Sequence, residues 1–229
     1  MGKEEKINAT HFRIPRHVLE ERIGMELNGR YHDYGEVIPL RHIQHVDYLE
    51  FLTHDFLESL IRHIPLKGEP DTLPYEQAQI SLFSRESKGV LLSQRFVMED
   101  KLVSLMNSFS NQELFKRFVT KGISDMPPTK VYGRDHEDKK VFAIYLPPII
   151  EQRNEGEVLL DGTHRSYICK SVGSGVYAVH IAGVNGTYPT TPVSWEECVL
   201  CKVKPPKEVR YKDLDIRFFR DLNYIGVDG

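Results

Sequence analysis

The chain lacks any long hydrophobic run. Its longest apolar stretches, such as residues 141–150, are far shorter than the roughly 20 residues that a membrane-spanning helix needs. The first residues are charged and lack the apolar region of a signal peptide. The sequence therefore predicts a cytoplasmic protein with no membrane partner.

Cysteine is also scarce, with 3 residues among 229, a number that suits a reducing compartment rather than a disulfide framework. Cys198 and Cys201 have the spacing of half a zinc site, but such a site normally takes four ligands. The alternating residues around them favour two small side chains in a strand. His42 and His45 lie three apart, near an expected helix start where solvent-facing imidazoles are common. We assign no metal-binding residue to either pair.

Neither sign of charge dominates, because 30 basic residues stand against 33 acidic ones and give a net charge of −3. No global positive field would hold nucleic acid, so DNA is the less favoured partner. Internal repeats and low-complexity tracts are missing too, which excludes a solenoid or a disordered array. The hydrophobic content of 40% can fill a core. The single tryptophan, Trp195, is expected to begin a short helix capped by Ser194 and Glu197 and to pack on a sheet.

Apolar residues at helical spacing predict helices in the first half of the chain. One is expected over residues 15–25, a second over residues 46–64 and two more between residues 99 and 122, interrupted near residue 109. Residues 37–40 predict a short edge strand, because Pro39 is tolerated only at an edge.

The later part of the chain is richer in strand-forming residues. Residues 140–146, 157–160 and 175–181 predict strands, and residues 165–172 predict a helix that ends at Gly173. The combination indicates a mixed α/β (α+β) fold. We predict an N-terminal extension with a helix over residues 1–70, and a domain over residues 71–229 with a helical insertion at about residues 85–125.

Polar residues between the last two predicted strands form a short loop, residues 161–165, that suits phosphate. Gly162 lets the backbone approach a ligand closely, and Thr163 can cap the following helix. Arg165 offers a planar fork for phosphate oxygens. Asp161 could orient His164 or help to hold a metal ion. The alternative is an ordinary turn with Arg165 in a surface ion pair.

The surroundings of this 161–165 loop carry a resemblance to a known family. An apolar strand with Pro147 and Pro148, a turn at residues 154–157, a strand ending in Asp-Gly-x-His-Arg, a helix, a glycine turn and a further strand resemble the ParB/sulfiredoxin superfamily over about residues 141–182. The resemblance implies a ParB/sulfiredoxin-like mixed sheet with flanking helices. Thr163 stands where sulfiredoxins carry their catalytic cysteine, which disfavours sulfinic acid reduction. The helix-turn-helix region that follows in the DNA-clamp members is not evident.

Within this superfamily the motifs are most similar to those of the free-serine kinases, which have an Asp-Gly-His-His-Arg loop and an earlier Pro-x-Glu-Gln segment. Here the earlier segment is residues 74–77. The resemblance implies that Glu76 is the catalytic base, and that Asp161, His164 and Arg165 handle the phosphates of ATP or ADP with Mg²⁺. The implied function is a nucleotide-dependent phosphotransferase acting on a small hydroxyl-bearing substrate.

Two other functions stay open for the same fold. One is a non-catalytic nucleotide- or DNA-binding regulatory module, and the other is a ParB-like nuclease. Glu76 itself can also be interpreted as an exposed carboxylate at the start of a helix, because it follows Pro74. The sequence leaves open the acceptor substrate, the nucleotide base and the oligomeric state.

Overall fold

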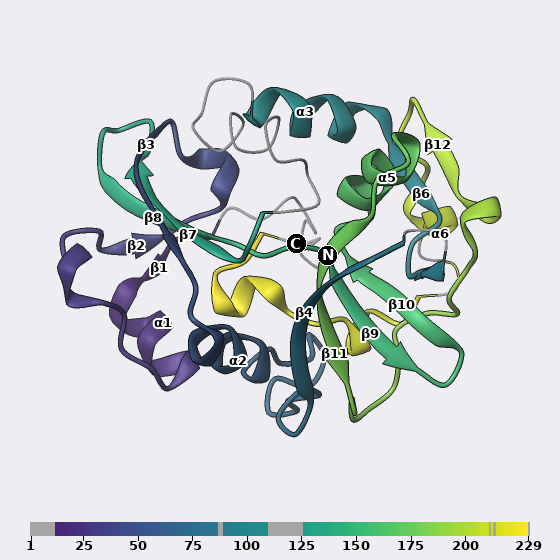
Figure 1. Ribbon diagram of the computed structural model, residues 1–229, viewed down its shortest axis with the longest axis horizontal. Coiled ribbons are helices and arrows are strands. Elements are labelled where there is room, and N and C mark those ends of the chain that lie inside the picture. Colours follow the sequence, from purple (N-terminus) through teal and green to yellow (C-terminus); the bar gives the residue numbers. More distant parts are fainter. Residues whose placement is uncertain (1–11, 87–88, 110–125, 211, 213, 229) are drawn as a thin grey trace, which may run out of the picture.

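Two five-stranded sheets organise the residues that the computed structural model describes, which are 12–86, 89–109, 126–210, 212 and 214–228 (Figure 1). The first sheet has the strand order β1-β2-β8-β7-β3. The second sheet has the order β4-β11-β9-β10-β5, and β12 and β6 form a separate pair. The mixed α/β class predicted from the sequence is therefore confirmed.

The strands and helices have the following bounds. The first sheet is built from β1 (Ile14–Pro15), β2 (Glu36–Val37), β3 (His45–Phe51), β7 (Thr129–Arg134) and β8 (Lys140–Tyr145). The second is built from β4 (Gln79–Arg85), β5 (Leu91–Leu92), β9 (Ile149–Arg153), β10 (Gly156–Asp161) and β11 (Val176–Ala182), and the separate pair from β6 (Phe96–Met98) and β12 (Val199–Cys201). The α-helices are α1 (Arg16–Ile23), α2 (His54–Arg62), α3 (Glu99–Phe109), α5 (Thr163–Ser171) and α6 (Lys207–Arg210). The short 3₁₀ helices are η1 (Gly29–Tyr31), η2 (Leu40–His42), η5 (Trp195–Glu197), η6 (Ile216–Phe218) and η7 (Leu222–Ile225).

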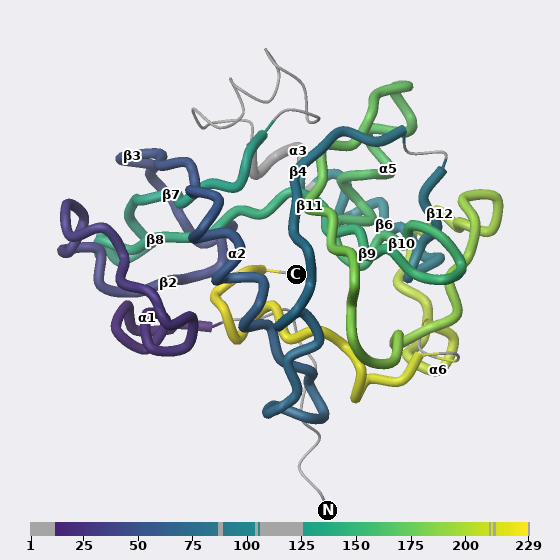
Figure 2. Tube along the Cα trace, turned by 60° about the horizontal axis from the view of Figure 1, so that its bottom comes forward, coloured from purple at the N-terminus to yellow at the C-terminus, as the bar shows by residue number. Residues whose placement is uncertain are grey.

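The largest hydrophobic core lies between the two sheets. Phe142 of β8 and Val179 of β11 both belong to it, together with Leu60 of α2 and Ile225 of η7. Figures 1 and 2 show the yellow C-terminal segment, which contains η7, passing between the two sheets. The C-terminal residues are therefore part of the core.

Each sheet is covered on its other face by a smaller core. The residues of β8 alternate, so that Phe142 faces the central core while Val141 and Ala143 face the outer one. On the second sheet the outer face is covered by α5, whose Cys169 packs in one cluster with Ala178 and Trp195. The short helix that begins at Trp195, with its capping box, is confirmed. The central strands of both sheets are thus buried on two faces, whereas the edge strands β3 and β4 are partly exposed.

The predicted helix over residues 46–64 is wrong in its first half. Residues 45–51 form β3, which pairs antiparallel with β7 at the edge of the first sheet. Thr53 then starts α2, because its hydroxyl accepts a hydrogen bond from the N–H of Phe56. Only the second half of the apolar pattern belongs to the helix, and the pairing with β7 decides the conformation of the first half.

Most other predicted elements are confirmed, including α1, α3, β8, β10, α5 and β11. The strand expected at residues 37–40 is β2, which lies between β1 and β8 rather than at an edge, and Pro39 follows it. The second helix expected before Gly122 falls at residues 110–125, outside the described residues.

Strands from both sides of residue 70 share the first sheet, because β1, β2 and β3 pair with each other or with β7 and β8. The division into residues 1–70 and 71–229 stays a prediction. Across the described part of the chain, every helix is too short or too polar to cross a lipid bilayer.

Candidate functional site

The 161–165 loop begins where β10 ends against β9. The pairing register of these strands shifts between Leu159 and Asp161, which marks a bulge, and such irregularities re-aim the next side chain. Gly162 follows with φ +86° and occupies the N-cap position of α5. The sequence suggested that Thr163 caps this helix. In the structure Thr163 is instead the first residue of the helix, and Gly162 is the cap. The loop delivers the chain directly into the N-terminus of α5.

Gly162 is required at this position by two constraints. Its positive φ disfavours any side chain, and an added Cβ would lie 2.8 Å from Cβ of Pro148. We expect Gly162→Ala to lower the free energy of unfolding by about 2 kcal/mol through backbone strain and the clash. Urea denaturation would measure the loss. Gly156→Ala is the matched control, because that glycine also has a positive φ but no atom within 4 Å of an added Cβ; equal losses in the two variants would exclude a role for Pro148.

Arg165 ties the loop to the end of the first sheet. One guanidinium nitrogen donates to the backbone oxygen of Leu146, and another donates to Oδ2 of Asp161 at 2.9 Å. The guanidinium carbon lies 5.4 Å from the ring centroid of Tyr145, and 14% of the side chain is exposed. Arg165 and Asp161 therefore form a mostly buried pair, unlike the surface ion pair of the alternative interpretation.

His164 makes a different connection, to the start of α3. Its Nε2 accepts a hydrogen bond from the N–H of Met98 at 3.0 Å. Burial, together with the nearby charge of Lys101, lowers the pKa of His164 to about 4. The imidazole is thus neutral at pH 7, with its proton on Nδ1. It can donate to a ligand only through Nδ1 and carries no positive charge for a phosphate.

Two hydroxyl groups lie on the buried face of α5. Thr163 is 5% exposed and Ser166 is 1% exposed, and residues three apart share one face of a helix. The N–H of Ser166 donates to the oxygen of Gly162 at 2.9 Å. The Ser166 hydroxyl, however, has no hydrogen-bond partner among the described residues. An unpartnered buried hydroxyl is unfavourable.

Glu76 is not brought to this loop. It is exposed in the turn before β4, and its backbone oxygen accepts a hydrogen bond from Arg62 at 2.9 Å. The register of β4 and β11 pairs Gln79 with Ala182 and Arg85 with Val176. The C-terminal end of α5 leads into β11 at Val176, and Asp161 is paired through Ile149 with Val179 in the middle of β11. Glu76 instead lies beyond Ala182, at the far end of this strand pair from α5.

Tyr75, the residue before Glu76, belongs to a charged network that the sequence did not predict. Tyr75 is fully buried, and its hydroxyl donates to Glu151 of β9. Arg220 Nε donates to the same carboxylate at 2.9 Å, and Arg153 Nε at 2.7 Å. The sequence did hold one signal for this network, because Glu151 directly follows Ile149 and Ile150 in a predicted apolar run. We call these four residues, Tyr75, Glu151, Arg153 and Arg220, the buried charge network.

The described side chains also bear on metal binding. They contain no group of three or more histidine, cysteine, aspartate or glutamate residues placed to hold a metal ion. Asp161 is the carboxylate of the 161–165 loop, and one of its oxygens is engaged by Arg165.

Comparison with known proteins adds no relative to this picture. The chain matches no protein-family model, no curated protein and no solved structure.

Proposed function

We propose that this protein is a nucleotide-dependent phosphotransferase with a ParB/sulfiredoxin-like loop, and that the N-terminus of α5 binds the nucleotide phosphates. The observation that carries the proposal is the buried Ser166 hydroxyl without a partner in the first turns of α5. The first N–H groups of a helix have no partner within the helix, and the helix dipole favours an anion there. A phosphate oxygen at this end would supply the acceptors that both kinds of donor lack.

The loop side chains would have separate tasks in this proposal. Arg165 fixes the loop through two of its nitrogens, which donate to Leu146 and Asp161, and contributes its positive charge. His164 would donate through Nδ1. Asp161 is the carboxylate of the 161–165 loop, and it would orient an incoming hydroxyl or take its proton. Mg²⁺ bound with ATP or ADP would neutralise phosphate charge.

A second function is favoured by one observation, which is the position of Glu76. The resemblance to free-serine kinases makes Glu76 the base, yet it lies at the far end of β4 from α5. A regulatory module that binds a nucleotide without turnover needs no base. Such a module would share the phosphate-binding loop and lack the transfer step.

Ser166→Ala tests the phosphate site. In the absence of ligand we expect this variant to be more stable by about 1 kcal/mol, because an unsatisfied buried hydroxyl is removed. Its affinity for ATP should fall about five- to tenfold, because one hydrogen bond to the phosphate is lost. Calorimetric titration with ATP, ADP and CTP, with and without Mg²⁺, measures the binding, and urea denaturation measures the stability.

Ser171→Ala is the matched control, because Ser171 lies on the same helix and its hydroxyl already donates to the oxygen of Tyr167 at 2.8 Å. Unchanged ATP affinity in Ser166→Ala would contradict the proposed site. If wild type binds ATP, hydrolysis or transfer that disappears in Asp161→Asn supports the phosphotransferase. Binding without turnover against a panel of hydroxyl compounds supports the non-catalytic module.

A further inference from the structure

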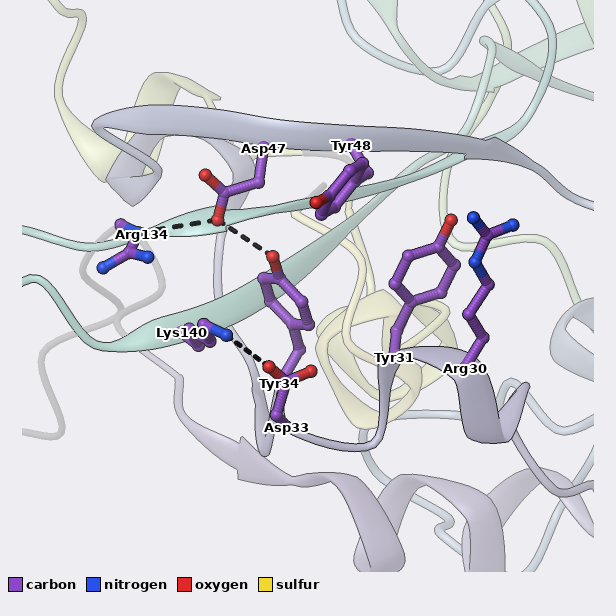
Figure 3. A pocket seen from close by; sticks show the side chains of 8 residues that line it. All are labelled: Arg30, Tyr31, Asp33, Tyr34, Asp47, Tyr48, Arg134 and Lys140. Carbon is purple, nitrogen blue, oxygen red and sulfur yellow. Dashed lines mark hydrogen bonds and ion pairs between the residues drawn. The ribbon is translucent and has the colours of Figure 1, made fainter.

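A second polar site lies on the first sheet, far in the fold from the face that α5 covers. It is an open pocket of about 280 Å³, which we call the tyrosine pocket. Three tyrosines and three cations contribute to its lining: Tyr31, Tyr34, Tyr48, Arg30, Arg134 and Lys140 (Figure 3). In Figure 1 the strands that frame it, β3, β7 and β8, lie to the left of the molecule, whereas α5 lies to the right.

The tyrosines belong to a row of rings that runs from the core to the surface. Tyr132 packs on Phe142 in the central core, with ring centroids 5.8 Å apart, and Tyr31 stacks on Tyr132 at 4.3 Å. Tyr48 follows at 5.6 Å from Tyr31. The row ends there, because Tyr48 is 54% exposed. A rigid aromatic ring held by its neighbours and open to solvent is a surface on which another planar ring can stack.

The charges in the pocket are balanced except for one. Lys140 donates to Asp33 and lowers the pKa of that carboxyl by this hydrogen bond. Arg134 lies 3.6 Å from Asp47, which also accepts a hydrogen bond from the Tyr34 hydroxyl at 2.9 Å. These pairs are the dashed contacts in Figure 3. They leave one cation of the lining without a carboxylate.

That cation is Arg30. Its guanidinium forms no ion pair or hydrogen bond with any residue that the structure describes, and its one ring contact is with Tyr31, at 5.6 Å from the centroid. Arg30 is exposed and lies beside Tyr31 at the rim, as Figure 3 shows. Its planar fork of donors is suited to a phosphate or carboxylate group. The pocket thus combines an open aromatic surface with one unpaired guanidinium.

We propose that the tyrosine pocket binds a free mononucleotide, with its base stacked on Tyr48 and its phosphate held by Arg30. The volume of about 280 Å³ lies just under the lower end of the range for small-molecule sites, which is about 300 Å³, so the ligand must be small. A longer nucleic acid is less suited, because the chain has a net charge of −3 and polyanion binding depends on many cations. The proposal is independent of the 161–165 loop.

The test separates the two halves of the ligand. We would titrate the full chain with AMP, adenosine and inorganic phosphate, and follow binding by calorimetry. Tyr48→Ala should weaken AMP and adenosine alike, by about tenfold, because base stacking is lost. Arg30→Ala should weaken AMP by about tenfold and leave adenosine unchanged, because only the phosphate contact is lost.

Controls keep the result specific to the pocket. Phe51→Ala removes another exposed aromatic ring of β3, and Arg217→Ala removes a cation whose side chain is 71% exposed; both should bind AMP as wild type does. Ser166→Ala should also leave this site unchanged, so a failure of the phosphate loop and a failure of the pocket give different results. Absence of AMP binding, or equal affinity in all variants, would overturn the proposal. Tighter binding of an oligoadenylate than of AMP would replace the mononucleotide by a single-stranded nucleic acid.

Discussion

Replacing Glu151 by glutamine is expected to lower the free energy of unfolding by about 3–5 kcal/mol, because it leaves a buried arginine without its counter-ion. Glu151 is 0% exposed, and the side chain of Arg220 is 1% exposed. Two of the guanidinium nitrogens lie 2.9 and 3.2 Å from the two carboxylate oxygens. Water cannot replace the lost charge at such a position.

The partners of Glu151 should rank below it in a predictable order. Arg220→Gln leaves the carboxylate paired with Arg153 and with the hydroxyl of Tyr75, so the loss should be smaller, about 2–3 kcal/mol. Arg153→Gln should cost least, because 12% of that side chain is exposed and Arg220 remains in place.

Urea denaturation of the Glu151, Arg220 and Arg153 variants at pH 7 measures this ranking. The order Glu151, then Arg220, then Arg153 follows from burial and from the number of charges left unpaired. An equal loss in all three variants would contradict this account of the buried charge network. A Glu151→Leu/Arg220→Met double variant is expected to recover part of the loss, because replacing both members of a buried pair by apolar side chains is often nearly neutral.

Acid is expected to destabilise the wild type by about 3 kcal/mol through His164 alone. Its pKa is lowered from 6.5 to about 4 in the folded chain, first because of burial. Between these two pH values the unfolded chain takes up a proton that the folded chain does not. The contribution of His164 to the free energy of unfolding is therefore fully present above about pH 6.5 and is lost as the pH falls to about 4. Below about pH 4 this contribution does not change further. Each unit of pKa difference corresponds to about 1.4 kcal/mol.

His164→Gln isolates this contribution. The amide oxygen of glutamine can accept the hydrogen bond from Met98 and does not titrate. Unfolding free energies measured from pH 7 to pH 4 should then fall less steeply in the variant than in wild type. His180, whose pKa is also lowered by burial, contributes equally to both chains and cancels in the comparison. His136→Gln is the control, since 72% of that side chain is exposed. Parallel curves for wild type and His164→Gln would contradict a protonation-linked role for His164.

The sequence predicts well where local signals suffice. The strand, loop and helix around Gly162 follow from an apolar run, an Asp-Gly pair and the closing Gly173, all within a short stretch. The same signals fail for β3, because its conformation depends on pairing with β7, which lies far along the chain. An apolar pattern alone does not reveal that partner.

In the candidate site, too, features set by neighbouring residues could be predicted, whereas features set by distant contacts could not. The 161–165 loop could be found from its own residues, but not the role of His164, which depends on the N–H of Met98. Glu76 seemed suitable by motif, whereas strand register sets it at the other end of β11 from α5. The tyrosine pocket escapes sequence reasoning because Tyr31 and Tyr48 meet only after the first sheet has assembled.

The order in which the strands enter the two sheets has a consequence for synthesis. The chain contributes β1, β2 and β3 to the first sheet, then β4 and β5 to the second, and returns to the first with β7 and β8. On the ribosome, β2 and β3 must wait for β8 and β7 before their edges are paired, and η7 reaches the core last of all. Folding dominated by such distant pairing is slow. A nascent chain halted before residue 129 would therefore expose strand edges. We expect the growing chain to depend on chaperones until the C-terminal segment, which contains η7, has left the ribosome.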